Sequence, residues 1–181
     1  MKPRLATVWM GGCSGCHMSF LDLDEFLIDL AGMVEIVFSP VVDAKEYPRD
    51  VDVCLIEGAV CNEEHVEMAR KIRERTKTVI AFGDCAVTGN VTAIRNQLGS
   101  GNVEKVLQCA YIDHADINQQ IPCLRGIVPA LLERVMPVHE VIPVDYYLPG
   151  CPPSAARIKS FVSQLLEGKA PQLAGADLRF G

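Results

Sequence analysis

Two cysteines near the start of the chain have a spacing that is common in metal and redox sites. Cys13 and Cys16 are separated by Ser14 and Gly15. They follow the apolar run 5–9 and precede a segment with helical spacing, which places them on the turn between a first strand and a first helix. Two thiols on such a turn have three common uses: half of an iron–sulfur or zinc site, a redox-active disulfide, or packing alone.

Two more cysteines follow the ends of other predicted strands. Cys85 comes after the apolar run 78–82, and Cys151 comes after the run 141–148. The carboxyl ends of parallel strands share one edge of a sheet, and ligands bind in the crevice outside that edge. Four thiolates at one edge are what an iron–sulfur cluster needs. The predicted sheet would bring together Cys13, Cys16, Cys85 and Cys151.

The loops around these thiols are rich in glycine and proline. Glycines let main-chain amides approach sulfur atoms, which would stabilise a negatively charged cluster. Prolines stiffen a loop that must hold its thiol in place. The residues concerned are Gly11, Gly12, Gly15, Gly83, Gly150, Pro149, Pro152 and Pro153.

The other four cysteines lack such a setting. An isolated cysteine is more often a small buried hydrophobic residue than a ligand, which we expect of Cys54, Cys109 and Cys123. Cys61 lies just past a strand end near the proposed crevice, so packing is favoured but a role in the site stays open. No site is assigned to the chemistry-bearing residues scattered between 91 and 124, which are Cys109, Asp113, His114, Asp116 and Cys123.

Three other sites remain alternatives at this point. Structural zinc usually takes its ligands in two close pairs, whereas this chain has one pair and two separate cysteines. A thioredoxin-like dithiol enzyme would explain Cys13 and Cys16 but not the loops of the two later cysteines. A flavodoxin-type phosphate loop after the first strand has weak support, because Ser14 is the only hydroxyl side chain there.

Alternating apolar runs and helical patterns predict an α/β fold with a parallel sheet covered on both faces. At 181 residues we expect one domain, 1–168, followed by a Pro- and Gly-punctuated tail, 169–181. Predicted strands are 5–10, 33–38, 51–56, 78–82 and 141–148. Predicted helices are 20–31, 62–75, 125–135 and 154–166, with a less clear helix at 91–98, strand-like fragments within 103–112 and a loop at 41–50.

Composition narrows the classes of partner. The net charge is −6 without a long basic run, so nucleic acid is not an expected partner. The chain shows no signal-peptide pattern, no twin-arginine pair and no apolar stretch of membrane-spanning length. These features predict a cytoplasmic protein without a membrane span. In that reducing compartment eight cysteines favour metal ligation or redox chemistry over a disulfide framework.

Four separated motifs resemble those of one known family. Over about residues 5–168 the chain resembles the small subunit of nickel–iron hydrogenases and, with variation, the related cluster-bearing subunit of respiratory complex I. The resemblance implies a flavodoxin-like domain in which Cys13, Cys16, Cys85 and Cys151 ligate one 4Fe–4S cluster at the carboxyl ends of the strands. The motifs are Val8–Cys16, Ile56–Val60, Ala81–Ala86 and Pro149–Pro153.

Departures from the family patterns indicate which branch of the family the chain resembles. The chain lacks the C-terminal cluster-binding domain of respiratory small subunits, and its first two cysteines are not adjacent as in complex I. His17 and Met18 stand where standard small subunits have Ser-Glu, so the family role of that glutamate in proton transfer does not carry over. The chain looks most like the small subunit of cytoplasmic NAD-reducing, bidirectional hydrogenases.

This resemblance implies an oxidoreductase that works as a heteromer. A large subunit would carry the nickel–iron site that splits dihydrogen, and this chain would relay electrons to a diaphorase module with flavin (FMN) and further clusters that reduces NAD. The chain itself contains no NAD-binding fingerprint. Another hydrogenase complex, or a complex I-like one, is the alternative assembly. Glu57, at a predicted strand end, could move protons or cap backbone amides.

Overall fold

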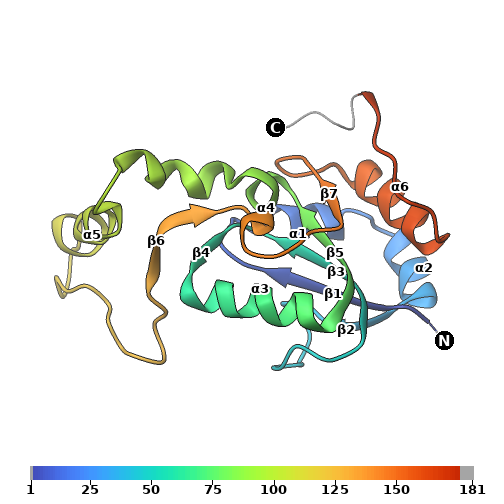
Figure 1. Ribbon diagram of the computed structural model, residues 1–181, viewed down its shortest axis with the longest axis horizontal. Helices are drawn as coiled ribbons and strands as arrows, with labels where there is room; N and C mark the ends of the chain where they lie inside the picture. The colour runs from blue at the N-terminus through green and yellow to red at the C-terminus, as the bar shows by residue number, and fades with distance from the viewer. Residues whose placement is uncertain (1, 176–181) are drawn as a thin grey trace.

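A five-stranded parallel sheet forms the centre of the molecule (Figure 1). The computed structural model describes residues 2–175, so residues 176–181 of the predicted tail lie outside the described part. The strand order is β2-β1-β3-β5-β7, in which the order reverses beside the first strand. This is the flavodoxin-like order, and it confirms the predicted fold class. The strands are β1 (Arg4–Trp9), β2 (Glu35–Phe38), β3 (Val51–Glu57), β5 (Thr76–Phe82) and β7 (Tyr146–Leu148).

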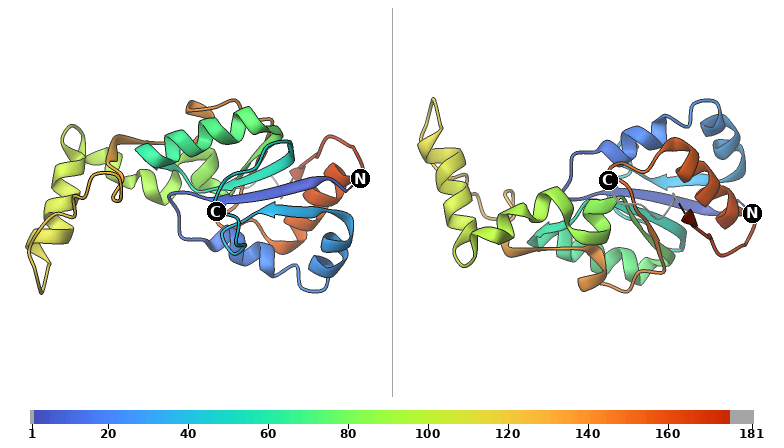
Figure 2. Two further views of the ribbon diagram at one scale, coloured as in Figure 1. Left: turned by 90° about the horizontal axis from the view of Figure 1, so that it is seen from below. Right: turned by 90° about the horizontal axis from the view of Figure 1, so that it is seen from above.

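Alternate residues of the central strands enter two separate apolar cores, because successive side chains point to opposite faces of a sheet. In β3, Ile56 packs in one core and Leu55 in the other. Ala81 and Ile80 divide in the same way in β5. Both faces are covered, as the unbroken apolar runs predicted (Figure 2). One core packs against α3 (Glu63–Arg75) and α4 (Asp84–Thr88), and the other against α1 (Gly15–Leu21), α2 (Phe26–Met33) and α6 (Ala155–Leu166).

Two of the covering helices begin at the residues that the sequence indicates. The Asn62 side chain accepts a hydrogen bond from the backbone N–H of His65 at 2.8 Å and caps α3. The Ser154 hydroxyl accepts one from the backbone N–H of Arg157 at 3.3 Å and caps α6. The predictions of helices at 62–75 and 154–166 are therefore confirmed.

The buried face of α3 provides a stability test. Ile72 is fully buried against the sheet, whereas Ile28 of α2 is 75% exposed. We expect Ile72→Val to lower the free energy of unfolding by about 0.5–1.5 kcal/mol, since it removes one buried methylene and leaves a gap. Ile28→Val removes the same atoms from a solvated position and serves as the control. Denaturant titration should show a change only for Ile72→Val, and equal changes would contradict this packing.

Three predicted elements differ from the structure. The helix predicted at 125–135 is wrong: β6 (Leu131–Met136) pairs antiparallel with β4 (Val60–Asn62). The Asn96 side chain bonds both the N–H and the C=O of Val135 at 2.9 Å, a long-range contact that favours the strand. The predicted helix 20–31 is interrupted between α1 and α2, where Asp24 has φ 51°. The last strand, predicted at 141–148, is shorter and begins only after Pro143, which has no N–H to donate to a neighbouring strand.

The segment after β5 is helical rather than extended. Residues 90–98 form a 3₁₀-helix, η1 (Asn90–Leu98), close to the helix predicted at 91–98. The strand-like fragments predicted within 103–112 are wrong, since this region forms α5 (Asn102–Gln108) and a π-helical turn, η2 (Cys109–Asp113). None of residues 103–134 is buried, and Figure 2 shows this part extending away from the sheet. Apolar patterns therefore report little about local structure there. A further 3₁₀ turn is η3 (Val138–Glu140).

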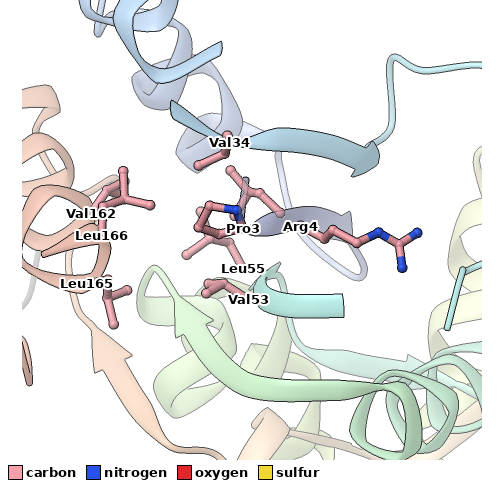
Figure 3. Close-up of a pocket in the computed structure, with 9 residues that line it drawn as sticks. Pro3, Arg4, Val34, Val53, Leu55, Val162, Leu165 and Leu166 are labelled. Carbon is pink, nitrogen blue, oxygen red and sulfur yellow. The ribbon is translucent and has the colours of Figure 1, made fainter. Parts of the chain in front are cut away.

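A small packing gap lies at the opposite end of the sheet. A cavity of about 20 Å³ lies at the amino ends of β1 and β3, between Pro3, Val53 and Leu165 (Figure 3). The cavity is barely large enough for one water molecule and its lining is apolar, so it is not a candidate site. Across residues 2–175, no helix is both long enough and apolar enough to cross a membrane.

Candidate metal centre

Loops at the carboxyl edge of the sheet carry all four predicted ligands. Cys13 lies in the loop after β1, and Cys16 lies in the first turn of α1. Cys85 is the second residue of α4, directly after β5, and Cys151 follows β7. The structure therefore places the predicted residues at one edge, as parallel strands require. Cys16 is buried and Cys85 half-buried, whereas Cys13 and Cys151 are exposed.

The thiols are near enough to affect one another. Burial is the largest cause of a raised pKa at the Cys16 thiol, followed by the Glu57 carboxylate and then the thiols of Cys85, Cys13 and Cys151. Burial also raises the pKa of Cys85, with the thiols of Cys151 and Cys13 as the next causes. Like charges raise a thiol pKa only at short range. Ligation that places these thiolates on iron would remove this repulsion.

Backbone contacts hold the three loops against one another. Gly83, at the end of β5, has φ 82°, and a Cβ atom there would overlap the Cys16 sulfur and lie 3.5 Å from the carbonyl oxygen of Gly150. The N–H of Gly83 donates to Leu148 at 2.8 Å, which continues the β5–β7 pairing into the loops. Only a residue without a side chain allows this approach.

Several hydrogen-bond donors point at the sulfur atoms. The N–H of Gly15 donates to Cys13 Sγ at 3.4 Å, and Asn90 Nδ2 donates to Cys151 Sγ at 3.3 Å. Backbone donors of Thr92 and Val91 act in the same sense on Cys85, where they oppose the rise in pKa. Such donors stabilise thiolates and set the potential of an iron–sulfur cluster. Asn90 is not among the predicted site residues, because its only signal in the sequence is its place after Gly89 at the end of the Cys85 motif.

Glu57 is buried beside Cys16, with 2% of its surface exposed. Its carboxylate accepts the N–H of Cys16 at 3.3 Å and the N–H of His17 at 2.8 Å, which are free donors in the first turn of α1. The same carboxylate pairs with Nδ1 of His17. The interpretation of Glu57 as a cap for nearby amides is confirmed, and a proton-transfer role stays a prediction.

This cap gives a second stability test. We expect Glu57→Ala to lower the free energy of unfolding by about 1–3 kcal/mol, because it leaves buried amide donors without an acceptor. Glu57→Gln keeps one side-chain oxygen and should lose less. Denaturant titration of both variants measures the difference, and an unchanged midpoint in Glu57→Ala would show that the carboxylate does not support α1.

The proton-transfer role of Glu57 is tested by activity. If Glu57→Gln leaves the hydrogen turnover of the complex unchanged, Glu57 does not transfer protons.

The donor set fits a multi-iron cluster better than a single ion. Within residues 2–175, no three His, Cys, Asp or Glu side chains converge closely enough to share one metal ion. A zinc ion would need its sulfur ligands at about 2.3 Å from one centre. In a 4Fe–4S cluster each cysteine binds a different iron, so the sulfur atoms stand further apart. Four thiols with amide donors around them match that second arrangement.

The remaining cysteines divide into two groups. Cys54 is fully buried in β3, and burial raises its pKa to about 12, so the packing interpretation is confirmed. Cys61 is half-buried, with its Sγ donating to the carbonyl oxygen of Ala59 at 3.4 Å. Cys109 and Cys123 are exposed, so the expectation that they are buried is wrong. Both lie in the part of the chain that extends away from the sheet, where no core is available.

Residues 13–165, which include all four candidate ligands, match the protein family described as NADH ubiquinone oxidoreductase, 20 Kd subunit. The chain belongs to this family. The chain is 34% identical to subunit delta of the NAD-reducing hydrogenase HoxS of Cupriavidus necator, over 93% of this chain and 80% of that one. This relative agrees with the resemblance to hydrogenase small subunits seen in the motifs.

Two further comparisons support the assignment to the family. The chain superimposes on a chain of a crystal structure of an NAD⁺-reducing nickel–iron hydrogenase in the H2-reduced state, with a TM-score of 0.93, 42% identity and full coverage of both chains. It is 38% identical to one of the subunits of the F420-non-reducing hydrogenase of Methanothermobacter marburgensis, over 98% of this chain. It spans only 58% of the length of that relative.

Proposed function

We propose that this family member is the electron-transfer small subunit of a nickel–iron hydrogenase and holds one 4Fe–4S cluster through Cys13, Cys16, Cys85 and Cys151. The observation that carries the proposal is the meeting of these four thiols at one edge of the sheet, where the neighbouring thiols contribute to the raised pKa of Cys16 and of Cys85. The match to an NAD⁺-reducing hydrogenase structure over the whole chain supports it.

The chain's own residues would set the properties of this site. When bound, the cluster supplies a carrier that accepts and releases one electron at a time. The amide donors of Gly15 and Asn90 would stabilise negative charge on the sulfurs. The buried Cys16 and the apolar residues below it would keep water from that side of the site. Glu57 would hold the first turn of α1, and with it Cys16, in place.

The proposed partners follow from the exposure of the site and from the relatives. Cys13 and Cys151 are exposed, so a partner must cover this edge to protect a low-potential cluster from oxygen and solvent. We assign that role to a large subunit with the nickel–iron site. A diaphorase module with FMN and further clusters would take the electrons and reduce NAD, in line with the names of the NAD-reducing relatives.

Anaerobic purification of the complex tests the proposal. The chain, produced together with its large subunit, should be brown and contain about four irons per small subunit beyond those of its partners. Electron paramagnetic resonance should show this cluster reduced under H2 and, with the diaphorase present, under NADH. A colourless complex that contains zinc would contradict the cluster assignment. A chain that is stable in air as a monomer with an intact cluster would contradict the need for a covering partner.

A different electron acceptor is the second candidate, favoured by the similarity to the F420-non-reducing hydrogenase of Methanothermobacter marburgensis. The cluster would be the same, but the electrons would leave to a module other than an NAD-reducing one. H2-dependent reduction of NAD and of a viologen dye separates the two. If the complex reduces the dye and not NAD in the presence of every co-purified subunit, the NAD assignment is wrong and the second candidate holds.

A further inference from the structure

The cysteine that follows β7 has the weakest support from the sheet. Strand β7 has only three residues and lies at the edge of the sheet, so it pairs with β5 alone. Cys151 comes three residues after its end and is exposed. The loop between them must therefore be held by contacts outside the strand pairing, and within the described residues several of these come from the segment that carries Cys85.

Asp84 makes a two-point contact with this loop. Its backbone N–H donates to the carbonyl oxygen of Gly150 at 2.9 Å, and its carboxylate accepts the N–H of Gly150 at 2.6 Å. Only 4% of Asp84 is exposed. A charge-assisted hydrogen bond in a buried place is stronger than a neutral one, and the two contacts fix the backbone of Gly150, directly before Cys151.

The other end of the same short segment reaches the sulfur itself. Asn90 Nδ2 donates to Cys151 Sγ at 3.3 Å. Asn90 has φ 36° and follows Gly89 at φ 87°, so the backbone turns in the left-handed region to bring this side chain to the loop. Residues in such a conformation cost free energy and persist where surrounding contacts compensate.

We propose that Asp84 and Asn90 are positioning residues for Cys151: Asp84 fixes the backbone before it, and Asn90 orients and stabilises its sulfur. This rests on the proposed function, since it assumes that Cys151 binds the cluster. The segment after β5 would thus supply one ligand, Cys85, and hold another in place. A ligand from an edge strand then has the fixed geometry that a cluster needs, because partners of metal ligands orient them.

The test compares Asp84→Ala, Asp84→Asn and Asn90→Ala in the anaerobically purified complex. Asp84→Ala loses the carboxylate that accepts the N–H of Gly150. This variant should release iron to a chelator about tenfold faster or more. Asp84→Asn keeps an oxygen for the N–H of Gly150 and should release iron near the wild-type rate. Its cluster should be reduced at a more positive potential, because a buried negative charge is gone. Asn90→Ala should move the potential the other way, since a hydrogen bond to sulfur is lost.

Asp145 supplies a matched control. Its carboxylate accepts the N–H of Val79 at 2.7 Å. This bond links β5 to the start of β7, at the end of β7 that lies away from the thiols. Asp145→Ala should lower the melting temperature without changing iron release or potential. Equal iron release in Asp84→Ala and Asp145→Ala, or an unchanged potential in Asn90→Ala, would overturn the proposal. If Asp84→Ala does not fold, Asp84→Asn and Asn90→Ala decide it by the directions of their potentials.

Failure of this proposal is distinguishable from failure of the proposed function. If the wild-type complex contains no cluster on this chain, the proposed function is wrong. If the wild-type chain holds its cluster and Asp84→Ala releases iron at the same rate, only the positioning role is wrong.

Discussion

Serine in place of Cys13, Cys16, Cys85 or Cys151 is expected to abolish electron transfer from H2 to NAD in the complex. A hydroxyl is a poor ligand for cluster iron compared with a thiolate, and each of the four thiols would bind a different iron. Each variant should therefore lose the cluster or retain a damaged one. Iron analysis and electron paramagnetic resonance of the reduced complex measure this directly.

Two other cysteines are suitable controls for these variants. Cys109 is exposed and distant from the sheet, so Cys109→Ser should leave iron content and spectrum unchanged. Cys61→Ser tests a competing thiol, which lies half-buried past the end of β3, in β4. Full cluster occupancy in all four ligand variants would reject the site. If Cys61→Ser loses the cluster and one of the four other variants keeps it, Cys61 is a ligand in place of that cysteine.

Alanine at Gly83 is expected to prevent assembly of the site, although it adds a single methyl group. The new Cβ would overlap the Cys16 sulfur, and the φ of 82° is strained for any residue with a side chain. Cys16 cannot move away easily, because it is buried in the first turn of α1 under Glu57. We expect nearly complete loss of cluster iron in the purified complex, accompanied by a lower melting temperature.

Gly32 provides the same substitution in an open place. Apart from the chain neighbours of Gly32 and the backbone of its own helix α2, no atom of residues 2–175 lies within 4 Å of a Cβ placed there. Gly32→Ala should therefore stabilise the protein by about 0.5–1 kcal/mol through higher helix propensity, with full cluster content. Normal iron content in Gly83→Ala would show that the loops after β5 and β1 do not meet as closely as described.

The sequence was most informative where burial decides structure. The segments that form β3 and β5 are apolar with little interruption because helices cover both faces of the sheet. The ends of the predicted strands therefore placed Cys85 and the Cys13–Cys16 turn in the correct loops. The sequence also correctly indicated where α3 begins, because the cap at Asn62 is a local feature.

Long-range contacts account for what the sequence could not show. Strand β6 depends on Asn96, some forty positions earlier, whose side chain bonds both backbone groups of Val135. The two-point contact of Asp84 and the amide of Asn90 are likewise visible only once two loops are placed side by side. The cytoplasmic location and the division at residue 168 remain predictions.

The parallel order of the strands also has a consequence for biogenesis. The candidate ligands come from positions 13, 16, 85 and 151, and their loops become neighbours only when β7 has joined β5 at the edge of the sheet. A closely spaced cysteine motif could capture iron on a nascent peptide, but this one cannot complete its ligand set until the last strand has been synthesised and docked. On the proposed function, cluster insertion should therefore follow the docking of β7, and the bound cluster would stabilise the folded chain by mass action.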